Sequence, residues 1–252
     1  ITFCDTRTFG EKIKWGDGIG LDEEKIHINP FFHSKLEDIK TFFEPVKVSK
    51  DNLPSGYLFL PARYIPQKNH ILVLLALREL REKRNIEIPL VCVGIDKGNL
   101  YYLKQKAKEY GLEDKVFFYG TVSNQDLVYL YKKAFALVFP VFNGPDNLPP
   151  LEAMSYECPV IASKLEGSEE QFGDAALLFD KTNEVELADR IQELLMTPGL
   201  REELIKRGKL CIKDKTPGNY ANNIIKLVDQ FEKKRRAWGD GFYDLLPNFE
   251  DK

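Results

Sequence analysis

A chain of 252 residues with 43% hydrophobic and 30% charged residues is long enough for one sizeable core and an appendage. Its 36 basic and 39 acidic residues give a net charge of −3, which leaves no electrostatic footprint for nucleic acid. The four cysteines and three histidines lack metal-ligand spacing, so we expect free thiols in a reducing compartment and no structural metal. No stretch approaches the roughly 20 apolar residues of a membrane-spanning helix.

The first 33 residues are interpreted as the end of a preceding domain. The chain starts at Ile1 without a charged or apolar leader, so we expect no signal peptide and a longer parent protein. A short helix is predicted over 6–14 and a short strand, stopped by proline, over 25–30. Residues 34–55, rich in Lys and Glu, are predicted to be a surface connector.

From residue 57 onward, short apolar runs alternate with amphipathic stretches. The runs are continuous, which is typical of strands buried on both faces of a parallel sheet. We expect strands at residues 57–60, 90–93, 116–119, 136–139, 160–162 and 176–179. We expect helices at residues 69–84, 99–110, 124–134, 150–157 and 185–196. This order predicts an α/β fold, a doubly wound, Rossmann-like parallel sheet with right-handed crossovers, over residues 56–212.

Ligands of such sheets bind beyond the carboxyl ends of the strands, where two cations follow the first predicted strand. Arg63 and Lys68 lie in that loop, and together they can neutralise a diphosphate, the arginine bidentately and the lysine as a point charge. A solvated basic loop is the alternative. That alternative, the commoner one for any single Arg or Lys, is weakened because this loop and the loop before Pro150 belong to the same face.

The segment 139–163 joins two predicted strands through a Gly/Pro/Asn loop and a short helix. Pro149 and Pro150 suit the first helical positions, so we expect the helix to begin there and its free N–H groups to favour a phosphate. Glu152 would then lie in the first turn, where its carboxylate can accept bonds from sugar hydroxyls. The alternative is that Glu152 only complements the helix dipole, and from this segment alone that alternative is favoured.

A long amphipathic helix is predicted over 220–237, within a final segment 213–252. Its apolar stripe includes Ile224, Ile225, Leu227, Val228 and Phe231. The basic run 233–236 either faces the helix C-terminal dipole, which we favour, or lies on an anionic membrane.

Several segments match one family at the right spacing. Residues 62–68 are similar to the motif Gly-Arg-x-x-x-x-Lys, with Ala62 in place of glycine. Further matching segments are 118–122, 127–131, 147–154, 158–163, Gly167, Glu170 and 173–178. Between residues 57 and 209 the chain thus resembles the C-terminal, donor-binding domain of the retaining GT-B glycosyltransferases of family four, also called glycosyltransferases group 1.

The resemblance implies a role for each matching residue. Arg63 and Lys68 would be catalytic, binding the donor diphosphate and stabilising the leaving phosphate in place of a metal ion. Glu152 would bind the ribose of the nucleotide, which reverses the preference stated above. The remaining implied donor-binding residues are Asn147 and Leu148 at the phosphate or sugar, and Gly120 and Val122 beside the base.

One position departs from the family pattern. Many relatives carry a second glutamate eight residues before the one that matches Glu152, and this chain has Gly144 there. Asp146 is the candidate to reach the same space; the alternative is that backbone amides alone orient the sugar.

The expected protein is the donor half of a glycosyltransferase without a metal or other cofactor. Its expected partners are a nucleoside diphosphate sugar, a saccharide or lipid-linked acceptor, and an N-terminal acceptor domain of which only residues 1–33 are a remnant. A cytoplasmic location is expected, either free or with peripheral contact at the inner face of the membrane. The alternatives are a non-catalytic nucleotide-sugar-binding module and, less favoured, a GT-B epimerase or phosphorylase.

Overall fold

The computed structural model describes residues 2–4, 26–28, 45–46, 48, 53–143 and 148–236. For 2–4, 26–28 and 231–236 it describes the backbone alone. The predicted helix over 6–14 and most of the predicted connector 34–55 lie outside these residues. The strand predicted over 25–30 is present as β2 (Ile26–Ile28), which pairs in parallel with β1 (Thr2–Cys4), a strand that was not predicted.

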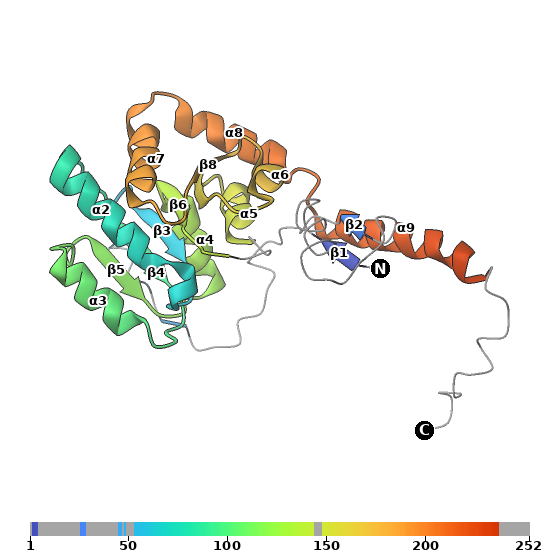
Figure 1. The fold of residues 1–252 in the computed structure, drawn as a ribbon, viewed down its shortest axis with the longest axis horizontal. Helices are drawn as coiled ribbons and strands as arrows, with labels where there is room; N and C mark the ends of the chain where they lie inside the picture. Colours follow the sequence, from blue (N-terminus) through green and yellow to red (C-terminus); the bar gives the residue numbers. More distant parts are fainter. Residues whose placement is uncertain are drawn as a thin grey trace, which may run out of the picture.

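A parallel sheet of six strands forms the centre of the molecule (Figure 1). The strands are β3 (Leu58–Pro61), β4 (Leu90–Val93), β5 (Val116–Tyr119), β6 (Ala136–Phe139), β7 (Val160–Ser163) and β8 (Ala176–Phe179). Their spatial order is β5-β4-β3-β6-β7-β8, and all five neighbouring pairs are parallel. The chain therefore winds outward from β3 in one direction and from β6 in the other, as a doubly wound fold requires.

Helices connect the strands and cover both faces of the sheet. They are the 3₁₀ turn η4 (Pro66–Lys68), α2 (His70–Arg84), α3 (Leu100–Glu109), α4 (Asn124–Lys133), α5 (Leu148–Ser155), α6 (Ser168–Phe172) and α7 (Glu184–Met196). Two further helices follow: α8 (Leu200–Ile212) packs against α5, and α9 (Pro217–Arg236) comes after it. Each crossover is long enough to return the chain to the same end of the sheet, which is why every strand runs in the same direction.

The core is divided by the sheet into two clusters. Strand side chains alternate between faces, so Leu58 and Leu60 join a cluster with α2, α3 and α7, while Tyr57 and Phe59 join one with α4, α5 and α6. All four of these strand side chains are buried. Because the strands are apolar on both faces, the sequence shows continuous hydrophobic runs there.

The predicted α/β class and all six strands of the sheet are confirmed, with ends shifted by at most one residue. Helices α6 and α8 were not predicted, and the C-terminal helix begins at Pro217 rather than at residue 220. On α9, the side chains of Ile225 and Val228 are more than half exposed.

Candidate functional site

The strand order reverses between β3 and β6, which are hydrogen-bonded neighbours. Loops that leave these two strands diverge to opposite sides of the sheet, and the crevice between them is where doubly wound proteins bind ligands. The predicted cations follow β3, and the predicted Gly/Pro/Asn loop follows β6. The topology thus brings the two segments singled out in the sequence to one point on the sheet.

Arg63 lies directly beyond β3, with an exposed side chain between two buried neighbours, Ala62 and Tyr64. The Tyr64 hydroxyl lies 3.0 Å from the carbonyl oxygen of Cys92 and 2.6 Å from that of Tyr119, so it anchors the segment to the ends of β4 and β5. Alternation of side chains along this extended segment directs Arg63 outward. It makes no ion pair with any residue that the structure describes.

Lys68 ends the 3₁₀ turn η4 and reaches the neighbouring strand. Its Nζ lies 5.5 Å from the ring centroid of Phe139, the last residue of β6, a cation–π distance. Asn69 follows with a left-handed φ of 51°, which an asparagine tolerates, and the chain then enters α2. The two predicted cations therefore lie in one loop, and Lys68 extends across the β3–β6 boundary.

A set of hydrogen bonds joins this loop to the segments after β6 and β8. Gln67 contacts Asn143 through their side chains and accepts a bond from the Phe142 amide at 3.1 Å. Lys181 donates to the Phe142 carbonyl oxygen at 2.9 Å, and Asn69 donates to the Lys181 carbonyl oxygen, also at 2.9 Å. Three loops are thus tied together at the strand ends. Nothing in the sequence singles out Lys181, which lies in an ordinary polar turn.

The structure corrects the position predicted for Glu152. Helix α5 begins at Leu148, so Glu152 is its fifth residue and no acidic residue lies in the first turn. The prolines do not force a later start, because the first four N–H groups of any helix lack partners and Pro149 and Pro150 lose nothing there. The dipole explanation for Glu152 loses its basis.

The carboxylate of Glu152 is half-buried and accepts a 2.8 Å hydrogen bond at Oε2 from the hydroxyl of Tyr131, on α4. Burial raises the pKa of Glu152, and the bond from Tyr131 acts in the opposite direction by stabilising the ionised form. Sequence reasoning placed Tyr131 in a family segment and missed this contact.

The segment predicted beside the base follows β5. The side chain of Val122 is buried, which leaves its backbone as the part that could lie beside a base. Gly120 is half-buried, and a Cβ there would lie 3.1 Å from the Val46 side chain. The Val46 amide donates to the Thr121 carbonyl oxygen at 2.6 Å. A residue of the predicted connector thus packs on this segment, which the sequence did not indicate.

The loop between β6 and α5 is described only at its ends. Leu148 lies in the first turn of α5 with 38% of its surface exposed. Gly144, Asp146 and Asn147 fall outside the described residues, so their predicted roles stay predictions.

A buried histidine lies beneath the cation loop. His70 is the first residue of α2, and its ring centroid lies 5.2 Å from that of Tyr64. Neither of its ring nitrogens has a partner of hydrogen-bonding distance and angle among the residues that the structure describes. Burial, assisted by the charge of Lys68, lowers the pKa of His70 to about 4, although the Ala62 carbonyl acts in the opposite direction. His70 is therefore neutral near pH 7.

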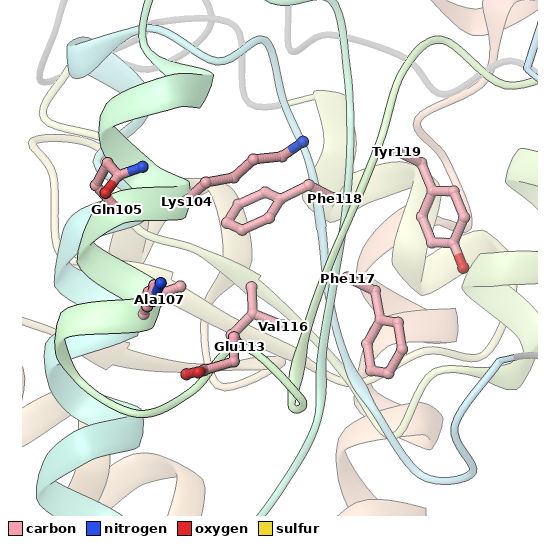
Figure 2. Close-up of a pocket in the computed structure, with 9 residues that line it drawn as sticks. Lys104, Gln105, Ala107, Glu113, Val116, Phe117, Phe118 and Tyr119 are labelled. Atoms are coloured by element: carbon pink, nitrogen blue, oxygen red, sulfur yellow. The ribbon is translucent and has the colours of Figure 1, made fainter.

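A separate cavity of about 560 Å³ opens at the edge of the sheet (Figure 2). It lies between α3 and β5, where Phe118 points toward Lys104 of α3. None of its nine lining residues is a predicted donor-site residue. It is thus distinct from the crevice between β3 and β6.

Two features are absent from the described residues. No group of three or more His, Cys, Asp or Glu side chains is arranged to hold a metal ion among them. Within the same residues, no helix has the length and hydropathy needed to cross a bilayer.

Among curated proteins, the chain is similar to mannosyltransferases. It is 31% identical to O-antigen chain mannosyltransferase B of Escherichia coli over 153 residues, 61% of this chain and 40% of that protein. It is 25% identical to human alpha-1,3/1,6-mannosyltransferase ALG2 over 219 residues, 80% of this chain and 53% of that protein. The chain thus spans about half, or less, of these relatives' length.

Among solved structures, the fold is similar to that of glycosyltransferases. A glycosyltransferase from Rickettsia africae superposes with a TM-score of 0.76 at 14% identity, over 92% of this chain and 63% of that one. Anabaena Alr3699/HepE, solved with UDP and glucose, gives 0.71 at 15% identity, over 92% and 62%. At these identities the likeness concerns the fold alone.

Residues 46–211, well over half of the chain, match the profile of one protein family. That span holds every predicted donor-site residue. The chain belongs to the family Glycosyl transferases group 1.

Proposed function

We propose that this chain is the donor half of a retaining glycosyltransferase that needs no metal ion or other cofactor. It binds a nucleoside diphosphate sugar and transfers the sugar to a saccharide or lipid-linked acceptor held by an N-terminal domain. The observation that carries the proposal is the convergence of the Arg63–Lys68 loop, the start of α5 and Glu152 at the carboxyl ends of the strands. The names of the relatives support mannose as the sugar.

Each residue has a proposed task. Arg63 pairs bidentately with the diphosphate and Lys68 adds a point charge beside β6. Departure of the nucleoside diphosphate builds negative charge, which these cations stabilise more in the transition state than in the ground state. Backbone amides at the start of α5, including that of Leu148, supply further donors at a helix N-terminus.

The nucleoside end is recognised on the other side of the site. Glu152 accepts hydrogen bonds from the ribose hydroxyls, and the backbone of 120–122 lies beside the base. Asp146 and Asn147 contact the sugar or phosphate, and Gly144 leaves the sugar to be oriented without a second glutamate. The acceptor's lipid would bring the protein to the cytoplasmic face of a membrane.

Calorimetric titration tests the donor site. We would titrate the chain with UDP, GDP, ADP, dTDP and CMP in EDTA, and repeat the titration on Arg63→Ala. We expect one diphosphate to bind and Arg63→Ala to weaken it by about 1.5 kcal/mol or more, the scale of a charge-assisted hydrogen bond. The control is Arg207→Ala, because Arg207 pairs with Asp174 and Glu203 on α8 and should not affect binding.

The outcomes separate the alternatives. If no diphosphate binds, or if Arg63→Ala binds as the wild type does, the proposed site is wrong. If binding is as expected, a longer chain that includes the N-terminal half should transfer sugar. A longer chain that binds but transfers nothing would identify a non-catalytic module.

A further inference from the structure

We propose that Tyr131 is a positioning residue for the ribose contact. Its hydroxyl holds one carboxylate oxygen of Glu152, so that the other oxygen remains in a fixed place to accept from the ribose. This inference rests on the proposed function of Glu152, and it adds a residue from α4 to a site otherwise built from strand ends and α5.

The Tyr131 ring has no freedom to turn away. It is fully buried, its centroid lies 5.8 Å from that of Tyr156 with the planes at 22°, and it meets Phe59 edge-on at 5.0 Å. Stacked and edge-to-face neighbours fix a ring more tightly than an aliphatic contact of equal area. The packing of the ring therefore fixes the position of the hydroxyl, and the 2.8 Å hydrogen bond from this hydroxyl fixes the carboxylate of Glu152.

The protonation states fix the direction of the bond. Burial, and then the charge of Glu152, raise the pKa of Tyr131 well above its ordinary value, so the phenol keeps its proton and donates. Glu152 in its ionised form only accepts, with two oxygens, one of which serves Tyr131. Ribose hydroxyls are donors, so the remaining oxygen has the chemistry needed to bind them.

The chain provides a matched control for this contact. Tyr57 is also buried, and its hydroxyl donates a bond of the same length, 2.8 Å, to the carbonyl oxygen of Leu130, the residue before Tyr131. Removing either hydroxyl breaks one hydrogen bond to or from α4, fully buried for Tyr57 and partly buried for Tyr131. Of the two hydrogen bonds, only the one from Tyr131 is made to Glu152, the proposed ribose-binding residue. Comparing the variants Tyr131→Phe and Tyr57→Phe therefore separates positioning of Glu152 from structural support of α4.

The experiment measures ribose selectivity by calorimetry. The probes are UDP and GDP with their 2′,3′-dideoxy counterparts, and the quantity is the ratio of dissociation constants of the dideoxy and ribose forms. We expect Tyr131→Phe to lower this ratio about fivefold, the scale of one hydrogen bond, and Tyr57→Phe to leave it unchanged. Tyr156→Leu removes the stacked ring and should lower the ratio less, in the same direction.

A pH series adds a readout that structural support alone would not move. Because the Tyr131 bond lowers the pKa of Glu152, its removal should make selectivity disappear at a higher pH as the solution is acidified. An unchanged ratio and pH profile in Tyr131→Phe would overturn the inference. Glu152→Ala tells the two failures apart: if it also keeps the wild-type ratio, the ribose role of Glu152 is itself wrong.

Discussion

Gly94, at the end of β4, controls where Arg63 lies. A Cβ built on Gly94 would lie 2.1 Å from the carbonyl oxygen of Ala62 and 2.6 Å from its carbonyl carbon. The Arg63 amide nitrogen would be 3.1 Å away. The obstacle is backbone, which cannot rotate aside as a flexible side chain can. Gly94→Ala must therefore push the segment after β3, and Arg63 with it, by about 1 Å, a displacement on the scale that matters for reacting groups.

Two quantities should change together in Gly94→Ala. Overpacking a closely fitted site costs about 1–3 kcal/mol, so we expect the free energy of unfolding in urea to fall by that amount. Displacement of Arg63 should weaken binding of the diphosphate at least about tenfold. Gly218→Ala is the control: a Cβ there meets nothing within 4 Å, and alanine in a helix is favoured over glycine by up to about 1 kcal/mol. Unchanged stability and affinity in Gly94→Ala would refute this reasoning, whereas lost stability with full affinity would show that Arg63 is not held by this contact.

Two further predictions concern the same loop. The pKa of His70 in the folded protein, about 4, lies below its ordinary value of 6.5. Between these two pH values the unfolded chain binds a proton at His70 that the folded protein does not bind. The free energy of unfolding, at its full value above pH 6.5, should therefore fall by about 3 kcal/mol as the pH approaches 4. In His70→Leu, the free energy of unfolding measured with urea should depend less steeply on pH between pH 4 and 7. If its pH dependence equals that of the wild type, His70 is not the source of that dependence. Lys181→Met should speed hydrogen exchange at the Phe142 amide and weaken diphosphate binding about fivefold, because the bond from Lys181 to the Phe142 carbonyl is lost. Lys181→Gln can still donate a hydrogen bond, so it should keep much of the exchange protection at the Phe142 amide and much of the diphosphate affinity. The control Lys164→Met breaks only an exposed ion pair with Glu169 and should change neither the exchange rate nor the affinity.

The strands were predictable because their pattern depends on local composition. Each contains an apolar run of three or four residues that stops at glycine, proline or a polar residue, and burial on both faces makes the run continuous. Helices α6 and α8 were not predicted, for two different reasons. The five residues of α6 are too few to show a helical period, and α8 exposes Leu210 while it buries Gly208 against Met154, so its apolar pattern is blurred.

The site was predictable as a set of segments, and much less as a set of contacts. Arg63, Lys68 and Glu152 were singled out from motif spacing and strand ends, yet their partners come from far along the chain: Tyr131 for Glu152, Phe139 for Lys68. Spacing carries no information on such pairs. Gly94 illustrates the limit, because nothing in the sequence indicates that the backbone of Ala62 and Arg63 occupies the space where a side chain would lie.

The boundary between β3 and β6 is also the least extensively paired seam of the sheet. Its register covers only Leu58 and Phe59, whereas β3 and β4 stay in register over all four residues of β3. A ligand bound at this boundary would contact residues of both half-sheets and so link two parts that share few hydrogen bonds with each other. A bound ligand should therefore raise the free energy needed to separate the half-sheets β3-β4-β5 and β6-β7-β8, which share the two side-chain clusters and the packing of α2 on α7.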